Sequence, residues 1–504
     1  MTAQLTPAAQ DQTAQTFEVR SPATGEVVGT FPVHSAEHVR DVVAQARGAQ
    51  LWWAELGFAG RRKRMQRWMR WLARHCDELY ELGFREGGKP KADVQFELLA
   101  GLEDIRWAAA HAKRVLGERR IAPGLAMLNF DARVAYEPLG VAGIIAPWNA
   151  PVYTVLCGMA YALAGGNAVV VKPSELSAAT GVWAVDSFRA ANRDAPAGLT
   201  AWVTGFGDTG AALCRSGVDK LAFTGSVPTG RRVMAACVEN LTPVLLELGG
   251  KDATVVAADA DLDAAASSIV WGGMWNAGQA CVGVERVYVV EAVRDEFLRK
   301  VADAASQVTV GTDELSSYGP MIVPNQIEII RRHVGDALAT GATALVGGPD
   351  SIKPPYVHPI VLVDVPEDCS AVTEETFGPV IVINTVRDED DAIARANGTS
   401  FGLGSSVFSA SRGAEIATRL RAGGTTINSV LTFVGMPALP FGGVGESGFG
   451  RFHGEDGLRE FTRAKSTTRK KFSMGEEMQV FPRTKDQFEI VRRVVKLRYG
   501  RRLR

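Results

Sequence analysis

Short apolar runs alternate with longer helical stretches from residue 141 onward. The apolar runs predict buried strands at 141–146, 168–171, 199–203 and 220–223. The stretches between them predict helices that begin near Val152, Ala178, Thr209 and Pro228. This alternation is typical of parallel strands joined by crossover helices. We therefore expect a doubly wound α/β sheet, which binds its ligands at the carboxyl ends of the strands.

A second series of apolar segments follows Lys251. These segments lie at 253–256, 286–290, 344–346, 380–384, 405–408 and 425–428. They predict another α/β domain. An alternating stretch at 127–136, ahead of the first series, predicts a hairpin arm.

Composition narrows the class of protein. A chain of 504 residues with 46% hydrophobic residues is long enough for two or three packed domains. Its net charge of −1 argues against nucleic acid as a partner. No apolar run is long enough to span a membrane, and residues 1–19 contain no Lys or Arg, so we expect a cytoplasmic protein. The six cysteines show no metal-ligand spacing, and no metal site is predicted.

Two stretches of the chain are strongly basic. Residues 61–74 hold seven basic residues among tryptophans and predict a basic amphipathic helix. Residues 483–504 hold nine basic and two acidic residues, and the part at 488–497 has a helical pattern. A membrane surface would attract such features. We favour instead a solvated helix face and a tail that packs on a neighbouring subunit.

The chemistry is concentrated in two short segments. Cys281 ends the run at 276–281, and Glu247 follows an apolar run and precedes a double glycine. A lone cysteine is usually a small buried hydrophobe, so the residues around Cys281 must show whether it is a nucleophile. A thiol among small residues with a carboxylate at a strand end supplies a nucleophile and a base.

Several further segments resemble the signature blocks of the NAD(P)-dependent aldehyde dehydrogenase superfamily, in the same order and spacing. They lie at 146–149, 172–175, 223–226, 374–379 and 440–443, with Ser447-Gly448 behind the last. The resemblance runs from about residue 17 to about residue 475. It implies a Rossmann-type cofactor domain, an α/β catalytic domain and a β oligomerisation arm.

The resemblance also implies domain boundaries. The NAD-binding domain is expected at 1–124 and 142–249, and the catalytic domain at 250–447. The arm is expected at 125–141 and 460–475, followed by a basic extension at 476–504. In the family such an arm pairs with a strand near the C-terminus, here 461–471, and with a second subunit. A homodimer or homotetramer is therefore expected.

One glycine-rich motif is not assigned to the cofactor phosphates. Gly205 begins a G-x-G-x-x-G match, but the next strand ends without an acidic residue that could hold a ribose. Glu175 closes an earlier strand together with Lys172, so these two are expected at the adenosine ribose. The resemblance assigns the phosphates to a G-S-x-x-x-G turn at Gly225 and Ser226, where a helix begins. Gly205 is then expected beside the adenine.

The resemblance implies further cofactor contacts. Glu375 matches the ligand of the nicotinamide ribose, and Phe377 is expected beside the ring. The remaining contacts are expected from Ala146, Pro147, Trp148, Ser174, Phe223, Thr229 and Leu248. NAD is favoured over NADP, because the Glu175 carboxylate would repel a 2′-phosphate. The ammonium of Lys172 keeps NADP open.

The implied mechanism uses three residues. Cys281 attacks the aldehyde carbon, and the Asn149 side chain with the Cys281 N–H stabilises the oxyanion. Hydride loss leaves a thioester, which Glu247 hydrolyses through a water. Relatives that pass the acyl group to coenzyme A tend to lack this carboxylate, so hydrolysis is favoured. An inactive relative would be expected to have lost one of these residues, and none is replaced.

The substrate is expected to be a neutral aliphatic or aromatic aldehyde. Residues 151–158 offer no Arg or Lys for a substrate carboxylate, unlike relatives that oxidise succinic semialdehyde. The neighbouring segments supply apolar side chains, namely Met274, Trp275, Val282, Phe433, Val434, Met436 and Leu439. A semialdehyde or coenzyme A-dependent activity stays as the alternative, and Trp275, Tyr153 and Phe433 could supply an aromatic cage for a quaternary ammonium.

Overall fold

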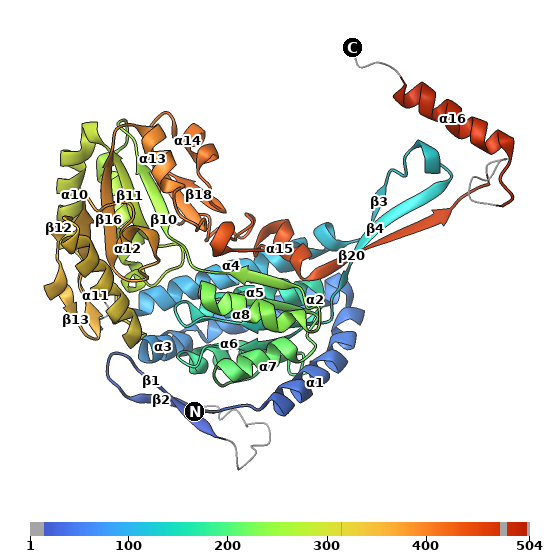
Figure 1. Ribbon diagram of the computed structural model, residues 1–504. Coiled ribbons are helices and arrows are strands. Elements are labelled where there is room, and N and C mark those ends of the chain that lie inside the picture. The colour runs from blue at the N-terminus through green and yellow to red at the C-terminus, as the bar shows by residue number, and fades with distance from the viewer. Residues whose placement is uncertain (1–14, 314, 474–480, 501–504) are drawn as a thin grey trace. The chain divides into compact units, whose positions relative to one another are not determined.

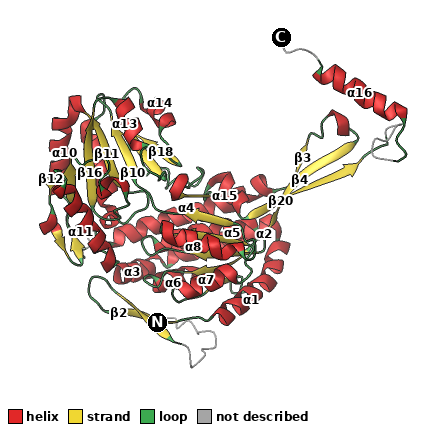
Figure 2. Ribbon diagram, in the orientation of Figure 1, coloured by secondary structure: helices red, strands yellow, loops and turns green. Residues whose placement is uncertain are grey.

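The computed structural model describes residues 15–313, 315–473 and 481–500. The chain divides into two compact units (Figures 1 and 2). The larger unit contains the described residues up to Val115 together with Pro138–Thr462. The smaller unit contains Leu116–Glu137 and the described residues from Arg463 onward.

A six-stranded sheet in the larger unit holds the first predicted series. Its strands are β5 (Val141–Ile145), β6 (Ala168–Lys172), β7 (Thr200–Trp202), β8 (Lys220–Thr224), β9 (Val244–Glu247) and β19 (Gly448–Phe449). The order is β19-β9-β8-β5-β6-β7, and all neighbours are parallel except β19 on β9. Ile145 stands beside Lys172 on one side and Phe223 on the other. The strand order therefore reverses at β5, as in a doubly wound sheet.

The helices of this sheet begin within two residues of their predicted starts. The connecting helices are α5 (Pro151–Gly165), α6 (Ala178–Ala191), α7 (Gly207–Arg215) and α8 (Val227–Val238). Ahead of the sheet come β1 (Thr16–Arg20), β2 (Val27–Pro32), α1 (Ala36–Glu55), α2 (Gly57–Arg74), α3 (Cys76–Gly87) and α4 (Lys91–Leu116). Helix α5 is buried along almost its whole length, which explains why its sequence is apolar on every side.

The predicted basic amphipathic helix is α2. Met65, Trp68 and Leu72 are buried on one face, and the Trp68 indole donates a hydrogen bond to the hydroxyl of Ser187 in α6. Arg61 is also buried, and burial lowers its pKa to about 10. The helix is therefore a packed layer over α6 with charges on its remaining surface.

A seven-stranded sheet holds the second predicted series. Its strands are β10 (Asp252–Val256), β11 (Val284–Val290), β12 (Thr343–Val346), β15 (Ile360–Val363), β16 (Val380–Val386), β17 (Gly404–Phe408) and β18 (Gly424–Ile427). The order is β12-β15-β16-β11-β10-β17-β18, and only β12 runs antiparallel to its neighbour. Strands β10, β11, β15 and β17 are buried at every position, as expected for strands covered on both faces.

Helices and short turns complete this part of the chain. The helices are α9 (Leu262–Met274), α10 (Arg294–Ser306), α11 (Pro324–Ala339), α12 (Ser370–Thr373), α13 (Glu389–Ala396), α14 (Gly413–Arg419) and α15 (Gly454–Glu460). The 3₁₀ turns are η2 (Trp275–Gly278), η3 (Glu291–Val293), η4 (Pro349–Ser351) and η5 (Gly445–Ser447). A small hairpin pairs β13 (Ile352–Lys353) with β14 (Tyr356–Val357).

The smaller unit is built on a three-stranded sheet of order β20-β4-β3. Its strands are β3 (Arg119–Ile121), β4 (Phe130–Pro138) and β20 (Thr462–Lys470), with the turn η1 (Leu125–Met127) between the first two. The predicted pairing of the arm with a strand near the C-terminus is confirmed. The Asp131 carboxylate accepts hydrogen bonds from Arg120 and Arg133 at 2.6 and 2.8 Å, which ties β3 to β4.

The basic extension forms α16 (Lys485–Tyr499), so the predicted helix is present. Its first turn carries a capping box in which Thr484 and Gln487 bond each other's backbone N–H groups. Phe488, Leu497 and Tyr499 are exposed on it. No described helix is long and apolar enough to cross a membrane.

Candidate active site

The residues predicted to bind the cofactor follow the carboxyl ends of neighbouring strands. Strand β5 leads into Ala146, Pro147 and Trp148, and β6 leads into Ser174 and Glu175. Strand β8 ends at Phe223 and Thr224 before the turn at Gly225, and β9 ends at Glu247. Because these strands are parallel neighbours around the reversal at β5, the fold gathers these residues at one edge of the sheet.

Helix α8 presents its N-terminus at this edge. Ser226 is the N-cap in an extended conformation, and no described side chain caps the helix. The Ser226 hydroxyl instead donates to the hydroxyl of Thr229 at 3.1 Å, and both residues are exposed. Leu248 packs against the same helix, 2.6 Å from where a Cβ on Gly230 would stand. Free amide N–H groups and the helix dipole fit a phosphate group here.

Lys172 and Glu175 lie close together, as the sequence predicts. Their charged groups are 3.8 Å apart, and Lys172 is buried whereas the Glu175 side chain is 39% exposed. Burial lowers the pKa of Lys172, and the Glu175 carboxylate opposes this shift. Gly205 lies just before α7, and its neighbour Phe206 has its ring 5.2 Å from that of Phe17.

Cys281 lies in a tight loop after η2. Asn276 and Ala277 both have positive φ, 53° and 56°, which costs conformational energy for residues with a side chain. The loop rests on Gly250, where an added Cβ would come within 2.3 Å of the Cys281 carbonyl oxygen. Only glycine allows this approach, so the double glycine after Glu247 brings the thiol loop close to the end of β9.

Glu247 is buried without hydrogen bonds. It is 3% exposed, and neither carboxylate oxygen has a partner among the described residues. Burial raises its pKa well above the ordinary value, Glu460 raises it further, and Arg451 lowers it. Buried polar groups are nearly always satisfied, so an unpartnered carboxylate at this place is a candidate for a chemical role.

The thiol of Cys281 lies within electrostatic reach of three carboxylates. Burial raises the pKa of Cys281 well above its ordinary value, and Glu375, Asp252 and Glu247 raise it further. Attack on a carbonyl requires the thiol to lose its proton.

Glu375 also contacts Gly250. One of its oxygens accepts a hydrogen bond from the Gly250 N–H at 2.9 Å. Burial and then the charge of Glu285 raise the pKa of Glu375 to about 8. Nearby, Phe377 has a positive φ of 49°, and its ring meets the Trp148 ring edge-on at 5.6 Å. Two of the predicted cofactor contacts, Trp148 and Phe377, thus come together.

Asn149 is held from several directions. Its side-chain amide donates to the carbonyl of Gln279 at 3.0 Å, two residues before Cys281. Its own carbonyl accepts from the Lys89 ammonium at 2.6 Å and from the Asn276 amide at 3.0 Å. Lys89 was not among the predicted site residues. In the sequence, Lys89 is marked only by its place in a Gly-Gly-Lys-Pro turn. Its partner, Asn149, lies 60 positions away.

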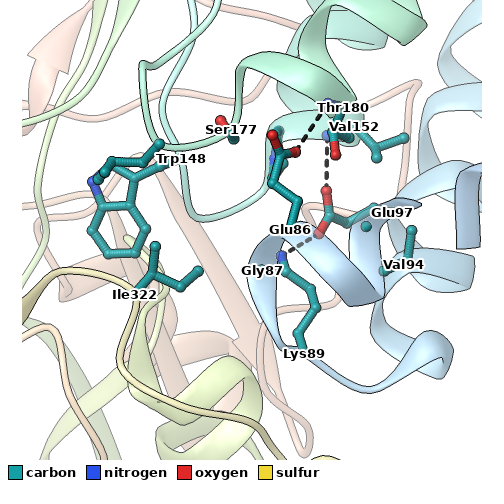
Figure 3. A pocket seen from close by; sticks show the side chains of 13 residues that line it. Glu86, Gly87, Lys89, Val94, Glu97, Trp148, Val152, Ser177, Thr180 and Ile322 are labelled. Atoms are coloured by element: carbon teal, nitrogen blue, oxygen red, sulfur yellow. Dashed lines mark hydrogen bonds and ion pairs between the residues drawn. The ribbon is translucent and has the colours of Figure 1, made fainter. Parts of the chain in front are cut away.

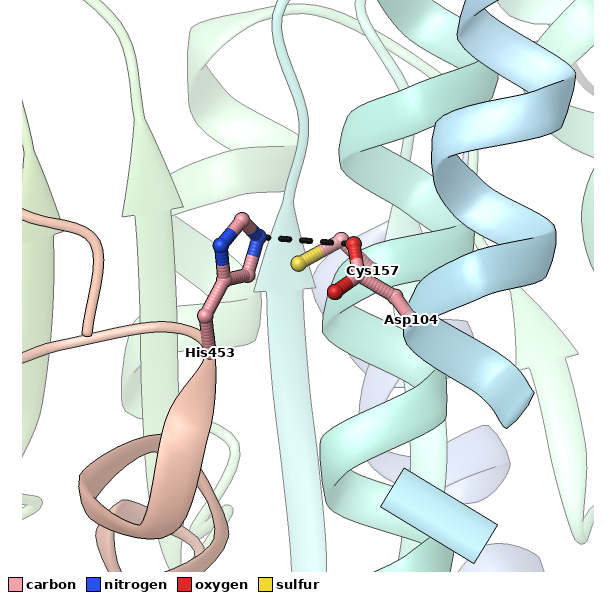
Figure 4. A group of neighbouring side chains, drawn as sticks. All are labelled: Asp104, Cys157 and His453. Carbon is pink, nitrogen blue, oxygen red and sulfur yellow. Dashed lines mark ion pairs between the residues drawn. The ribbon is translucent and has the colours of Figure 1, made fainter. Parts of the chain in front are cut away.

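A second group that the sequence did not predict lies along α5. Asp104, Cys157 and His453 are buried, with potential metal-ligand atoms within 4.8 Å of one another (Figure 4). His453 pairs with Asp104, and two tyrosine hydroxyls bond to this pair. His453 Nε2 lies 3.3 Å from the Asp104 carboxylate and 2.7 Å from the hydroxyl of Tyr153, and Tyr161 donates to Asp104. The group therefore fixes the Tyr153 side chain.

Comparison with known proteins assigns the family. The model of the Aldehyde dehydrogenase family matches residues 9–467. The chain belongs to the aldehyde dehydrogenase family. This aldehyde dehydrogenase is 37% identical over 489 residues to 4,4'-diapolycopene aldehyde oxidase of Methylomonas sp, across 96% of this chain and 92% of that protein. It is 35% identical over 459 residues to glutarate-semialdehyde dehydrogenase of Pseudomonas putida, across 90% and 94%.

Solved structures agree with the fold. The aldehyde dehydrogenase is similar to an NAD-dependent aldehyde dehydrogenase from Sinorhizobium meliloti, with a TM-score of 0.87 and 35% identity. That likeness covers 92% of this chain and 93% of the other. Betaine aldehyde dehydrogenase from Staphylococcus aureus in complex with NAD+ gives a TM-score of 0.85 at 27% identity, across 91% and 95%. The predicted family and α/β fold are confirmed.

Proposed function

We propose that this enzyme oxidises neutral, apolar aldehydes to carboxylic acids with NAD and releases the acid by hydrolysis. The observation that carries the proposal is the Glu247 carboxylate, which is buried and unpartnered within electrostatic reach of Cys281. A buried carboxylate with a raised pKa is suited to take a proton from a water.

Carbon–sulfur bond formation begins the reaction. The Cys281 thiol releases its proton to water, and the sulfur attacks the aldehyde carbon to form a thiohemiacetal. The developing oxyanion accepts hydrogen bonds from the Asn149 side chain and the Cys281 N–H. Asn149 donates to the Gln279 carbonyl with an amide that carries two N–H groups, so a second donor remains. Loss of one such donor costs about 10²- to 10³-fold in rate.

The residues around the strand ends fit a dinucleotide. The N-terminus of α8 with Ser226 would hold the phosphates, Lys172 and Glu175 the adenosine ribose, and Glu375 the nicotinamide ribose. When bound, the oxidised cofactor supplies an acceptor for the hydride that leaves the thiohemiacetal carbon. NAD is favoured because the half-exposed Glu175 carboxylate would repel a 2′-phosphate.

Hydrolysis completes the cycle. Loss of the hydride leaves a thioester on Cys281, and Glu247 accepts a proton from a water whose oxygen attacks the thioester carbon. The carbon–sulfur bond then breaks, the sulfur takes the proton back from Glu247, and the carboxylic acid leaves. Transfer to coenzyme A would need no such base, so Glu247 favours hydrolysis over an acylating reaction.

Exposed aromatic rings support an apolar substrate. The rings of Trp271 and Trp275 stack at 6.0 Å, and the Phe96 ring meets Trp275 edge-on at 6.1 Å. Trp271 is 45% and Phe96 48% exposed, and Trp275 precedes Cys281 by six residues. Exposed apolar patches of this kind mark ligand-binding surfaces. The name of the Methylomonas relative specifies the aldehyde of a long hydrocarbon, which agrees in chemistry.

A semialdehyde is the second candidate. It is favoured by the names of relatives that act on succinate or glutarate semialdehyde at 34% and 35% identity. A cage for a quaternary ammonium has less support, because Tyr153 bonds His453 and Phe433 stacks on Phe441. Two of the three rings are therefore engaged elsewhere.

Initial rates of NADH formation test the proposal. The panel contains hexanal, benzaldehyde, a detergent-solubilised long-chain aldehyde and succinic semialdehyde, each with NAD or NADP and with or without coenzyme A. We expect the neutral aldehydes to have the higher kcat/KM without coenzyme A, and Cys281→Ala to be inactive. A preference for succinic semialdehyde would sink the apolar substrate class. An absolute need for coenzyme A would contradict release of the acid by hydrolysis.

We also propose the three-stranded arm of β3, β4 and β20 as a subunit contact. Strand β20 is exposed along most of its length and lies at the edge of its sheet. An open edge of this kind can pair with another chain. Light scattering of the full chain should report a dimer or tetramer, and a monomer at micromolar concentration would contradict this role.

A further inference from the structure

We propose that Lys89 and Glu97 form a buried clamp that positions Asn149 for oxyanion stabilisation. The inference rests on the role given to Asn149 in the proposed function. It adds two positioning residues, neither of which needs to touch the substrate.

The ion pair is sealed from solvent. The Lys89 ammonium lies 2.7 Å from the Glu97 carboxylate, and the two side chains are 5% and 3% exposed. Figure 3 shows the pair facing each other beside a cavity of about 10 Å³, which is about the room that one water needs. Little water can therefore screen the attraction or replace either partner.

Both members of the pair hold the chain around Asn149. The Lys89 ammonium donates to the Asn149 carbonyl at 2.6 Å. The other Glu97 oxygen accepts from the N–H groups of Val152 and Tyr153 at 3.0 and 3.3 Å. These are first-turn residues of α5, whose N-terminus has no side-chain cap from its own N-cap residue Ala150. One ion pair thus holds both Asn149, in the β5–α5 turn, and the first turn of α5.

The position of a backbone carbonyl sets where its side chain can reach. The Asn149 carbonyl also accepts from the Asn276 amide, which belongs to the loop that carries Cys281. Lys89 and Asn276 therefore hold one oxygen from two directions. The Asn149 amide, which must meet the oxyanion, is tied to the thiol loop through this shared contact. A misplacement of about 1 Å at a reacting group can cost 10²-fold in rate.

Neighbouring charges explain why position 89 carries a cation. Glu86 and Asp93 are also buried, and the charge of Lys89 opposes the burial that raises their pKa values to about 7 and about 6. Glu86 accepts from the N–H groups of Ala179 and Thr180 at the start of α6. Lys89 is thus the common counter-charge for carboxylates that hold two helix starts.

Steady-state kinetics of Lys89→Met test the clamp. We expect kcat to fall about 10²-fold, the effect of losing an oxyanion donor, with little change in KM or in NAD binding. Alkylation of Cys281 by iodoacetamide forms no oxyanion, so its rate should stay within about twofold of the parent rate. Glu97→Gln keeps an acceptor for the α5 N–H groups but loses the charge. It gives the same test if Lys89→Met does not fold.

A double-mutant cycle separates positioning from general stability. If Lys89 acts through Asn149, adding Lys89→Met to Asn149→Ala should cost almost nothing further. A fully additive loss would overturn the clamp. Gln50→Met is the matched control, because the buried Gln50 amide bonds the Gly166 carbonyl at the other end of α5. An equal loss of kcat in this control would also overturn the clamp.

The same cycle distinguishes the two proposals. If Asn149→Ala lowers kcat and both Lys89→Met and Glu97→Gln retain full activity, the clamp fails and the proposed function stands. If Asn149→Ala itself retains full activity, the oxyanion role falls and the clamp falls with it.

Discussion

Two buried glutamates of this enzyme have equal burial and opposite surroundings. Glu97 and Glu247 are each 3% exposed. One Glu97 oxygen bonds Lys89, and the other bonds two backbone N–H groups of α5. Glu247, at the end of β9, has no hydrogen-bond partner among the described residues. Burial alone therefore does not distinguish these two carboxylates, whereas the number of their hydrogen bonds does.

The difference has an energetic meaning. A satisfied buried ion pair contributes to the fold because removing one member leaves the other charge uncompensated. An unsatisfied buried group costs about 1–3 kcal/mol, which the rest of the fold must offset. Glu247 is thus a place where stability is given up, as expected if it is the proposed base, whereas Glu97 keeps the surrounding chain in place.

The largest expected effect is on turnover of Glu247→Gln. Since the amide cannot accept a proton from water, steady-state kcat should fall about 10²- to 10⁴-fold. The first turnover should still form NADH, because hydride loss precedes hydrolysis. Stopped-flow absorbance checks both phases. Loss of the burst together with the steady-state rate would mean that Glu247 acts before the thioester forms.

Substitution of Glu97 should lower stability more than substitution of Glu247, although Glu247 has the larger effect on turnover. Glu97→Leu strands the Lys89 charge and should lower the free energy of unfolding by about 3–5 kcal/mol. Glu247→Leu removes an unsatisfied carboxylate and should leave this free energy unchanged or raise it. Urea denaturation followed by tryptophan fluorescence compares the variants. Equal destabilisation would break the distinction drawn here.

Crowding Glu247 should have a smaller effect on rate. At Gly442 an added Cβ would come 2.6 Å from a Glu247 oxygen and 2.7 Å from the Gly450 carbonyl oxygen, so Gly442→Ala must displace the carboxylate, the Gly450 backbone or both. We expect kcat to fall by about 10²-fold or less. Gly335→Ala on α11 is the control, since nothing lies within 4 Å of its added Cβ. Full activity of Gly442→Ala would show that the position of this carboxylate matters little.

The pH dependence should give the smallest effect. The base must be ionised, and burial raises the pKa of Glu247, so hydrolysis should weaken as pH falls through that raised value. The free energy of unfolding should depend on pH in the opposite direction. The folded state holds this proton more tightly than the unfolded state, so the free energy of unfolding falls as pH rises between the two pKa values.

Parallel measurements on Glu247→Gln check the pH prediction. The variant should lose both dependences, in the kcat profile and in urea denaturation across the same pH range. If they persist in the variant, another group is responsible for them.

Local patterns predicted most of the fold. Strands β5, β6 and β8 lie within one residue of their predicted bounds, because buried parallel strands are short apolar runs between turns. Glu247 could be predicted from its place before two glycines. The sequence does not show that both its oxygens lack partners, because that depends on side chains distant along the chain.

Distant contacts were the part that sequence could not supply. Lys89 reads as a turn residue, and nothing local indicates that its ammonium meets the carbonyl of Asn149. Arg61 reads as one more charge on a solvated helix, yet it is 5% exposed. His453 has a positive φ of 59° and meets Tyr153, which lies 300 positions away in the chain. Such pairs are set by packing.

The backbone of Gly250 has one more consequence. Its N–H donates to Glu375, and its missing side chain makes room for the Cys281 carbonyl. A single residue therefore touches the expected ribose ligand on one side and the thiol loop on the other. If Glu375 shifts when a nucleotide binds, the displacement can therefore pass through Gly250 alone to the loop that carries Cys281.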